Sequence, residues 1–261
     1  MSSTGTGQAR TRFAFLGLPL LGAVGAIGAW WGATIVFDIR SFFLPSPPQI
    51  VDRFLEQPEY LMREAWATLV GTLAGYGIAV VFALILALVL AAAPALERAT
   101  LPLLITLNSV PKVAIAPLLV LWLGYGPKPK IFLAALICFF PLVVSAMSGL
   151  ASTPTELTEL ARSLSASWWR TYRKFRIPWA LPQIFVGLKV AISLAPIGAV
   201  VAEVYNPDRG LGAVVALSTA SADTPLAFAA IALLALLSVA LYYLVVAVET
   251  LLLPWARDTT G

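Results

Sequence analysis

The stretch Ala65–Ala95 reads AWATLVGTLAGYGIAVVFALILALVLAAAPA and contains no charged residue. A helix needs about 20 apolar residues to cross the hydrocarbon core of a bilayer, so this stretch can span a membrane with some tilt. The whole chain has the same character: 60% of its 261 residues are hydrophobic and 11% are charged, against about 25% charged residues in soluble domains. The sequence therefore predicts an all-α integral membrane protein.

Five further apolar runs bring the predicted number of transmembrane helices to six. They cover residues 13–37, 101–125, 131–150, 184–204 and 226–255. We expect the 101–125 run to be broken or kinked, because Pro102, Pro111 and Pro117 remove backbone donors from it. Residues 1–12 are predicted to form a polar tail, and residues 13–261 a single transmembrane domain. A cleaved signal peptide is the alternative for the first run, which is longer than the apolar core of such a peptide.

Lysine and arginine residues predict the orientation of the chain. With the N-terminus inside, nine of them fall in inside segments and six in outside loops. Both termini and residues 151–183 are then predicted to be cytoplasmic, and the loop Asp38–Glu64 lies outside. The prolines of LPSPPQI (44–50) are expected to exclude a helix at the start of that outside loop.

Several classes of function are disfavoured by what the sequence lacks. It has no histidine, a single cysteine (Cys138), and no P-loop or dinucleotide fingerprint. We therefore predict no catalytic residue, no metal site and no nucleic-acid partner, which disfavours an intramembrane enzyme. A secondary transporter is a second alternative, but it would need paired repeats and acidic residues at span centres, and neither is evident.

The segment between the fourth and fifth runs, residues 151–183, is the exception to the apolar composition. Glu159–Gln183 alone holds five of the 17 lysine and arginine residues. Thr153 followed by Pro154 and Glu156 predicts a capping box and a helix start. An apolar stripe follows at helical spacing and comprises Leu157, Leu160, Ala161 and Leu164.

A second short helix is expected to begin at Ser167 and to end at Pro178 and Pro182. Two amphipathic helices between spans admit two interpretations. They can lie in the lipid headgroups, with basic residues on anionic lipid, or they can dock a soluble partner through the apolar stripe.

The same segment resembles the EAA loop of ABC-importer permeases, whose pattern is E-A-A-x3-G-x9-I-x-L-P. Glu159, Ala161 and Pro178 match, and Leu160 replaces the middle alanine. Ser165 stands at the glycine position, where a positive φ costs more for serine than for glycine. The stretches LPSPPQIV, LITLNSVPKVAIAPLLVLWLGYGPKPK and VVAEVYNPDRGLG are similar to permeases of the nitrate, sulfonate, taurine and pyrimidine-precursor branch.

The resemblance implies a permease subunit of the bacterial inner membrane that works by alternating access. Its partners would be an ATP-binding cassette ATPase, a second permease copy, a periplasmic or lipid-anchored substrate-binding protein, and membrane lipid. ATP and magnesium would be used by the ATPase, and the chain itself would be no enzyme and hold no cofactor. The residues expected to couple to the ATPase are Glu159, Leu160, Ala161, Leu164, Ser165, Trp168 and Pro178.

Charges and polar groups in the apolar runs are candidates for the transport pathway, because a charge at a span centre costs about 2.5–3.5 kcal/mol. Lys112 and Asn108 lie in the proline-rich run, and Glu203 lies at the end of the fifth. Lys112 favours a small anionic solute such as a sulfonate, taurine or nitrate, with a neutral heterocycle such as a thiamine pyrimidine precursor as the alternative. Lys112 can instead snorkel or pair with a carbonyl group, and Glu203 can anchor a loop or be solvated at a helix end.

Three further residue groups carry expectations of their own. Lys189 is expected to snorkel to the interface, and Glu249 to reach water or Arg257. The glycines of the second run, Gly71, Gly75 and Gly77, are expected to allow close helix packing.

Overall fold

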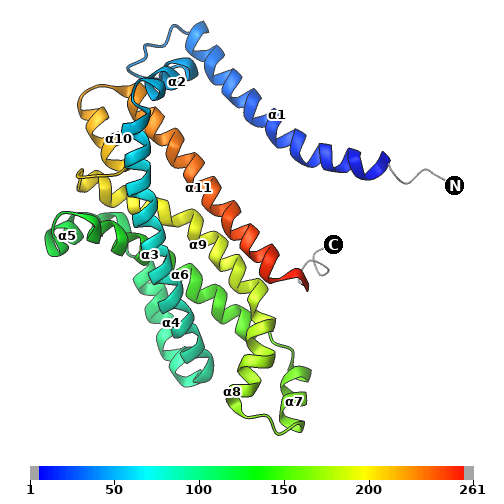
Figure 1. Ribbon diagram of the computed structural model, residues 1–261. Helices are drawn as coiled ribbons and strands as arrows, with labels where there is room; N and C mark the ends of the chain where they lie inside the picture. The colour runs from blue at the N-terminus through cyan, green and yellow to red at the C-terminus, as the bar shows by residue number, and fades with distance from the viewer. Residues whose placement is uncertain (1–5, 256–261) are drawn as a thin grey trace.

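The computed structural model describes residues 6–255, with the side chains of residues 6–20, Arg162 and Trp168 outside the description. Its regular structure is entirely helical (Figure 1). The elements are α1 (Thr6–Val36), α2 (Pro47–Glu56), α3 (Pro58–Ala92), α4 (Pro94–Ser109), α5 (Lys112–Leu123), α6 (Pro127–Ala151), α7 (Thr155–Ser163), α8 (Trp168–Thr171), the π-helix η1 (Tyr172–Arg176), α9 (Ile177–Tyr205), α10 (Leu211–Ala220) and α11 (Thr224–Leu252).

Four of these helices are long and apolar enough to cross a membrane. They are α3, α6, α11 and a continuous helix over Trp169–Tyr205 that includes α9. A fifth span is possible if α4 and α5 count as one, although they are bent by 86°. The expected number of six is not confirmed. The predicted first span, residues 13–37, falls in α1, whose side chains are described only from Leu21 onward.

Proline starts many of the helices. It occupies one of the first two positions of α2, α3, α4, α6, α9 and α11. The amide that proline lacks has no partner within a helix at that position, so its ring costs nothing there. The expectation that prolines exclude a helix in residues 44–50 holds for residues 44–46 and is wrong from Pro47 onward, because Pro47 and Pro48 begin α2. The side chain of Gln49 accepts a hydrogen bond from the Ser46 amide at 2.9 Å.

The predicted break in the 101–125 run is confirmed. α4 ends at Ser109, Val110 is extended, and α5 begins at Lys112 directly after Pro111. The preference of the residue before a proline for extended backbone explains the position of the break. α4 itself starts at Pro94, seven residues before the predicted span.

The helices α3, α6 and α9 form the core of the molecule (Figure 1). Small side chains let their backbones approach: a Cβ atom added to Gly75 would lie 2.6 Å from the Ile131 carbonyl oxygen, and one added to Gly198 would lie 2.6 Å from Ala134 Cα. Gly71 also faces α6, through the Lys130 side chain. Close packing is thus confirmed at Gly71 and Gly75, whereas Gly77 faces open space.

α1 and α2 contact the bundle at the α11 side. α1 meets the bundle near its own C-terminal end, where Trp30 packs against Phe228, and runs away from it toward its N-terminus (Figure 1). Of the predicted polar tail, residues 1–5 lie outside the described residues and residues 6–12 are helical. Arg53 of α2 pairs with Asp223, the N-cap residue of α11, and with Glu56, and these hydrogen bonds raise the pKa of its guanidinium.

Candidate functional site

The segment α7–α8 projects at one end of the molecule, opposite the end that holds α2 and α10 (Figure 1). We call these the loop end and the α10 end. The base of the projection is held where α6 finishes and α9 starts. There the indole of Trp179 donates to the Ser152 carbonyl at 3.1 Å, and a Cβ atom on Gly149 would lie 2.9 Å from the Ala180 carbonyl oxygen. The projecting segment is therefore anchored to the core at its root.

The start of α7 differs from the predicted capping box. α7 begins at Thr155, and the Pro154 carbonyl accepts from the amides of Leu157 and Thr158. The Thr153 hydroxyl does not cap α7 but donates to the Leu150 carbonyl at 3.1 Å. α6 ends only two residues before Thr153, and the last carbonyl groups of a helix lack partners within it. These carbonyl groups therefore accept hydrogen bonds from nearby hydroxyls such as that of Thr153.

The turn after α7 has a positive φ at Ser165, the conformation expected for a position that carries glycine in the EAA pattern. Ser165 has φ +48°, and the Ala166 amide donates to the Ala161 carbonyl at 2.9 Å. A six-residue bond of this kind closes a Schellman-type helix end. Ser165 therefore adopts the left-handed conformation, at a cost of about 1–2 kcal/mol for a residue with a Cβ atom.

The second helix of the segment begins after Ser167, as predicted, but it does not end at the predicted prolines. The Arg170 amide donates to the Ser167 hydroxyl at 3.4 Å, and α8 follows. The chain then continues through η1 into α9 without a break, so the prediction that Pro178 and Pro182 end this helix is wrong. The Ile177 amide bonds to the carbonyl of Tyr172, five residues back. This wider turn precedes Pro178, whose missing donor disrupts the regular α-helical bonding.

Half of the predicted apolar stripe is exposed. Ala161 is buried, and α7 packs against η1. Leu160 and Leu164, however, are 48% and 65% exposed, and Glu159 is also exposed. Trp168 begins α8, but its side chain lies outside the description.

Two of the predicted pathway residues contact each other across the bend. The Lys112 ammonium donates to the Asn108 side-chain oxygen at 2.6 Å and to the Asn108 carbonyl at 3.1 Å. Both side chains are half-buried. Two of the three donors of Lys112 are thus used within the chain.

Lys189 and Glu249 form an ion pair at 2.8 Å. Lys189 was expected to snorkel to the interface, and Glu249 to reach water or Arg257, but the structure pairs the two residues with each other.

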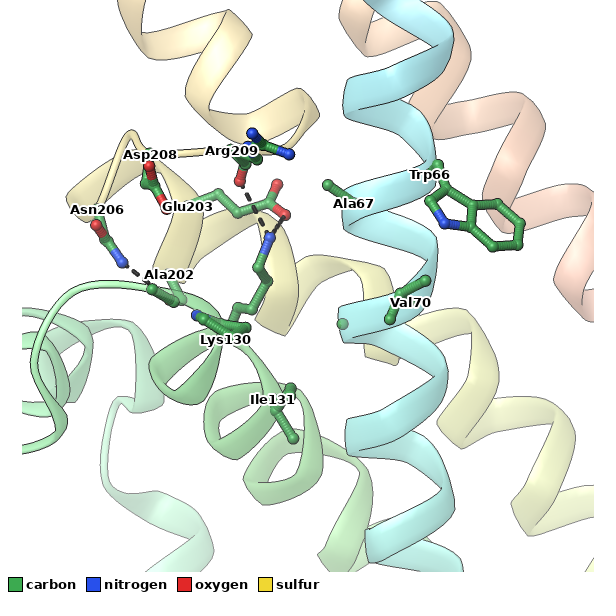
Figure 2. A pocket seen from close by; sticks show the side chains of 13 residues that line it. Trp66, Ala67, Val70, Lys130, Ile131, Ala202, Glu203, Asn206, Asp208 and Arg209 are labelled. Atoms are coloured by element: carbon green, nitrogen blue, oxygen red, sulfur yellow. Dashed lines mark hydrogen bonds and ion pairs between the residues drawn. The ribbon is translucent and has the colours of Figure 1, made fainter.

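Glu203 lies in a buried polar cluster at the α10 end (Figure 2). It is 2% exposed, so it is not solvated. Its carboxylate accepts from the Lys130 ammonium at 2.9 Å, from the Thr68 hydroxyl at 2.9 Å, and from the Gly212 amide at 2.9 Å. Lys130, itself 7% exposed, also donates to the Arg209 carbonyl at 3.0 Å. The buried charges are thus paired and hydrogen-bonded, as burial requires.

The same cluster caps the N-terminus of α10. Three successive amides there need acceptors. Gly210 donates to Glu64 at 2.8 Å, Leu211 to the Thr68 hydroxyl at 2.8 Å, and Gly212 to Glu203. The acceptors come from α3 and α9, so the cluster joins α10 to both. Glu203 therefore anchors a loop, one of the roles considered for it.

Residues 59–258 match the family model of the binding-protein-dependent transport system inner membrane component. The chain belongs to this family. It is a permease subunit of an ABC importer, a multi-pass protein of the inner membrane and a non-enzymatic member of its transport system.

Three relatives show the breadth of the branch. The permease resembles the riboflavin transport system permease protein RibX of Chloroflexus aurantiacus, with 37% identity over 87% of this chain and 85% of RibX. It resembles the formylaminopyrimidine transport permease protein ThiX of Halalkalibacterium halodurans, with 34% identity over 84% of this chain and 88% of ThiX. The taurine transport system permease protein TauC of Escherichia coli is 28% identical over 87% of this chain and 85% of TauC.

Sequence reasoning missed three polar residues of this cluster: Lys130 and Thr68, which contact Glu203, and Glu64, which accepts from the Gly210 amide. Lys130 and Glu64 were predicted to be charges of the outside loops, and no sequence pattern singled out Thr68. The sequence offered one signal: Glu203 is an acid at the end of an apolar run, and a buried carboxylate needs a cation. Arg209 is nearer in the sequence, but the structure pairs Glu203 with Lys130. Gly71 makes the approach possible, because a Cβ atom there would lie 2.6 Å from Lys130 Cδ. Lys130 and Glu203 also line a cavity of about 330 Å³ beside Trp66 and Arg209 (Figure 2).

Proposed function

We propose that this permease docks an ATPase through α7 and imports its solute by alternating access. The observation that carries the proposal is the exposure of Leu160 and Leu164 on a segment whose root is fixed to the core. Burying one such leucine in a partner contributes about 1.5–3 kcal/mol. Glu159 beside them would pair with a basic group of the ATPase. A docking role therefore accounts for apolar side chains that the chain itself leaves uncovered.

The orientation and the other partners follow from that role. The loop end faces the cytoplasm, where the ATPase uses ATP and magnesium, and both termini are cytoplasmic. The α10 end faces a periplasmic or lipid-anchored binding protein. Two copies of the permease enclose the pathway between them. A secondary transporter would need no docking segment of this kind.

For the solute we propose a neutral aromatic heterocycle of the vitamin-precursor type. The argument for an anion depends on Lys112, whose ammonium keeps its charge but gives two of its three donors to Asn108 and so has one left for a solute. The relatives named for riboflavin and formylaminopyrimidine are 37% and 34% identical, against 32% and 30% for two relatives named for aliphatic sulfonates and 28% for the taurine permease. A small anion such as taurine, another sulfonate or nitrate is the second candidate, since taurine is named for a member of the same branch.

Co-purification tests the docking. Leu164→Asp in tagged permease, solubilised with native cell extract, should reduce the ATPase recovered at least tenfold, because a carboxylate would enter an apolar groove. Ser163→Asp places the same charge on the adjacent exposed residue and should bind normally. Glu159→Ala should weaken binding or uncouple ATP hydrolysis. Recovery of the ATPase at wild-type level with Leu164→Asp would refute docking through this stripe.

Uptake into proteoliposomes tests the solute. The complete transporter, with its own binding protein, is offered radiolabelled thiamine pyrimidine precursor, riboflavin and taurine in turn. We expect ATP-dependent uptake of one heterocycle and none of taurine. Uptake of taurine alone would favour the anionic candidate and leave the docking proposal untouched.

A further inference from the structure

One helix connects the two ends of the molecule. The helix that begins in α8 and passes through η1 and α9 runs without a break over Trp169–Tyr205, 37 residues. At 1.5 Å per residue it is about 55 Å long. Its first turns carry the projecting segment, and Glu203 lies two residues before its last residue, Tyr205. A displacement at the loop end therefore reaches the α10 end along a single element.

Three hydrogen bonds attach this helix to α3 at successive levels. The Tyr172 hydroxyl donates to the Ala91 carbonyl at 2.8 Å near the loop end. The Tyr76 hydroxyl donates to the Leu188 carbonyl at 3.2 Å in the middle. The third bond, from Thr68 to Glu203, lies at the α10 end. From the loop end to the α10 end, the residue numbers of the partners fall along α3 and rise along the long helix. The two helices are therefore antiparallel.

α6 packs against both helices and completes the block. Besides the close contacts at Gly75 and Gly198, the Cys138 thiol donates to the Ala191 carbonyl at 3.2 Å. Packed helices with backbones this close move together more readily than they slide, because the interior is close-packed. α3, α6 and α9 therefore form a rigid block from one end of the molecule to the other.

The loop Asn206–Gly210 is attached to this block by polar contacts, and they continue into the first turn of α10. The rest of α10 packs on the block through Leu211 and Val214, which share an apolar cluster with Leu61 and Ala65 of α3. Lys130 holds the Arg209 carbonyl, Thr68 holds the Leu211 amide, and Glu203 holds the Gly212 amide. Asn206 also donates to the Gly126 carbonyl at 3.0 Å, at the start of α6. Asp208 and Arg209 are exposed between these attachments.

We propose that Lys130, Thr68 and Glu203 are positioning residues for transport, which lock the loop 206–210 and α10 to the α3–α6–α9 block. ATP-driven motion of α7 and α8 is then delivered to the loop at the far end of the molecule. The proposal rests on the proposed docking of the ATPase, and it adds the residues through which the motion is transmitted.

The experiment follows the accessibility of the loop in the complete transporter. Asp208→Cys is labelled with a membrane-impermeant maleimide, without nucleotide and with ATP plus vanadate. The native Cys138 is buried and stays unlabelled. We expect nucleotide to change the labelling rate at least about threefold. In Lys130→Met and, separately, in Thr68→Val, the ratio of the two rates should fall close to one while the ATPase stays bound.

Thr68→Val keeps the side-chain shape and the Lys130–Glu203 charge pair, so it decides the matter if Lys130→Met fails to fold. The matched control is Lys189→Met with Glu249→Gln, which removes the lysine–glutamate pair between α9 and α11 and should keep the threefold change. The proposal is wrong if the loop shows no nucleotide response in the parent protein. It is also wrong if Thr68→Val keeps the full response or the control loses it equally.

The two proposals fail in different ways. The labelling ratio requires no transported solute, so a wrong choice of solute leaves the test intact. Loss of the ATPase from the parent complex would instead refute the proposed docking.

Discussion

At the scale of single residues, glycine makes the polar cluster at the α10 end possible. Gly210 has φ +119°, and a Cβ atom there would lie 2.0 Å from the Glu203 carboxylate oxygen. At Gly212 a Cβ atom would lie 2.6 Å from the Val200 carbonyl oxygen. The Glu203 carboxylate can lie against the start of α10 and accept from the Gly212 amide only because these two positions carry no side chain.

We predict that Gly210→Ala lowers the free energy of unfolding of the permease by at least about 2 kcal/mol, because it combines a strained φ with displacement of a buried carboxylate. Thermal unfolding of the purified protein measures the effect. Gly77→Ala is the control, since a Cβ atom at Gly77 meets open space. A gain of about 0.5–1 kcal/mol is expected there from replacing a mid-helix glycine. Equal melting temperatures for the two variants would contradict the prediction.

At the scale of elements, the segment between α6 and α9 consists of three parts. These are α7, a turn with a residue in the left-handed conformation, and α8, which continues through η1 into the membrane-spanning helix α9. Ser165 ends the first helix at a positive φ. η1 absorbs the change of hydrogen bonding ahead of Pro178. The geometry by which α7 is presented therefore depends on two local features, one at the turn and one at the π-helix.

We predict that Ser165→Gly stabilises the turn by about 1 kcal/mol, because glycine adopts positive φ without the steric cost that serine meets. Hydrogen exchange of the Ala166 amide, which bonds to Ala161, should slow about fivefold. Ser165→Val should accelerate it, since a β-branched residue strongly disfavours this conformation. Unchanged exchange in both variants would show that the turn adopts another conformation in the membrane.

At the scale of the whole molecule, packing of small residues holds the α3–α6–α9 block together. The hydrophobic effect does not drive helices together inside the lipid bilayer, so van der Waals contact between closely packed backbones stabilises their association. The buried alanines along these helices include Ala79, Ala83, Ala87, Ala134, Ala146, Ala191, Ala195 and Ala199. This composition explains why the block can act as one body.

We predict that Gly198→Val separates α9 from α6 and lowers the melting temperature of the complex, because its Cβ atom would lie 2.6 Å from Ala134 Cα. Overpacking of this kind costs about 1–3 kcal/mol. Val190→Leu, at an exposed position of the same helix, is the control and should melt like the parent. Size-exclusion chromatography and thermal unfolding measure the result. A melting temperature equal to that of the control would argue against a tightly packed block.

The sequence by itself determined the membrane class, the break before Lys112, the helix start at Ser167 and the importer family. These features depend on local properties: apolar run length, the effect of proline on its neighbours, a hydroxyl beside a helix start, and a contiguous motif. The expected end of the second helix at Pro178 was wrong because a proline stops only the regular α-helical bonding, and a π-turn can carry the chain past it.

Only the tertiary structure decided which polar groups meet. Glu203 is 73 residues from Lys130 and 135 from Thr68 along the chain, and no local pattern relates them. Their pairing depends on how far α3, α6 and α9 slide along one another, which is set by glycine and alanine contacts over the whole block. The exposure of Leu160 and Leu164 likewise depended on which side of α7 packs on η1. A stripe in the sequence shows that a face is apolar, but only the packed molecule shows which part of that face remains uncovered.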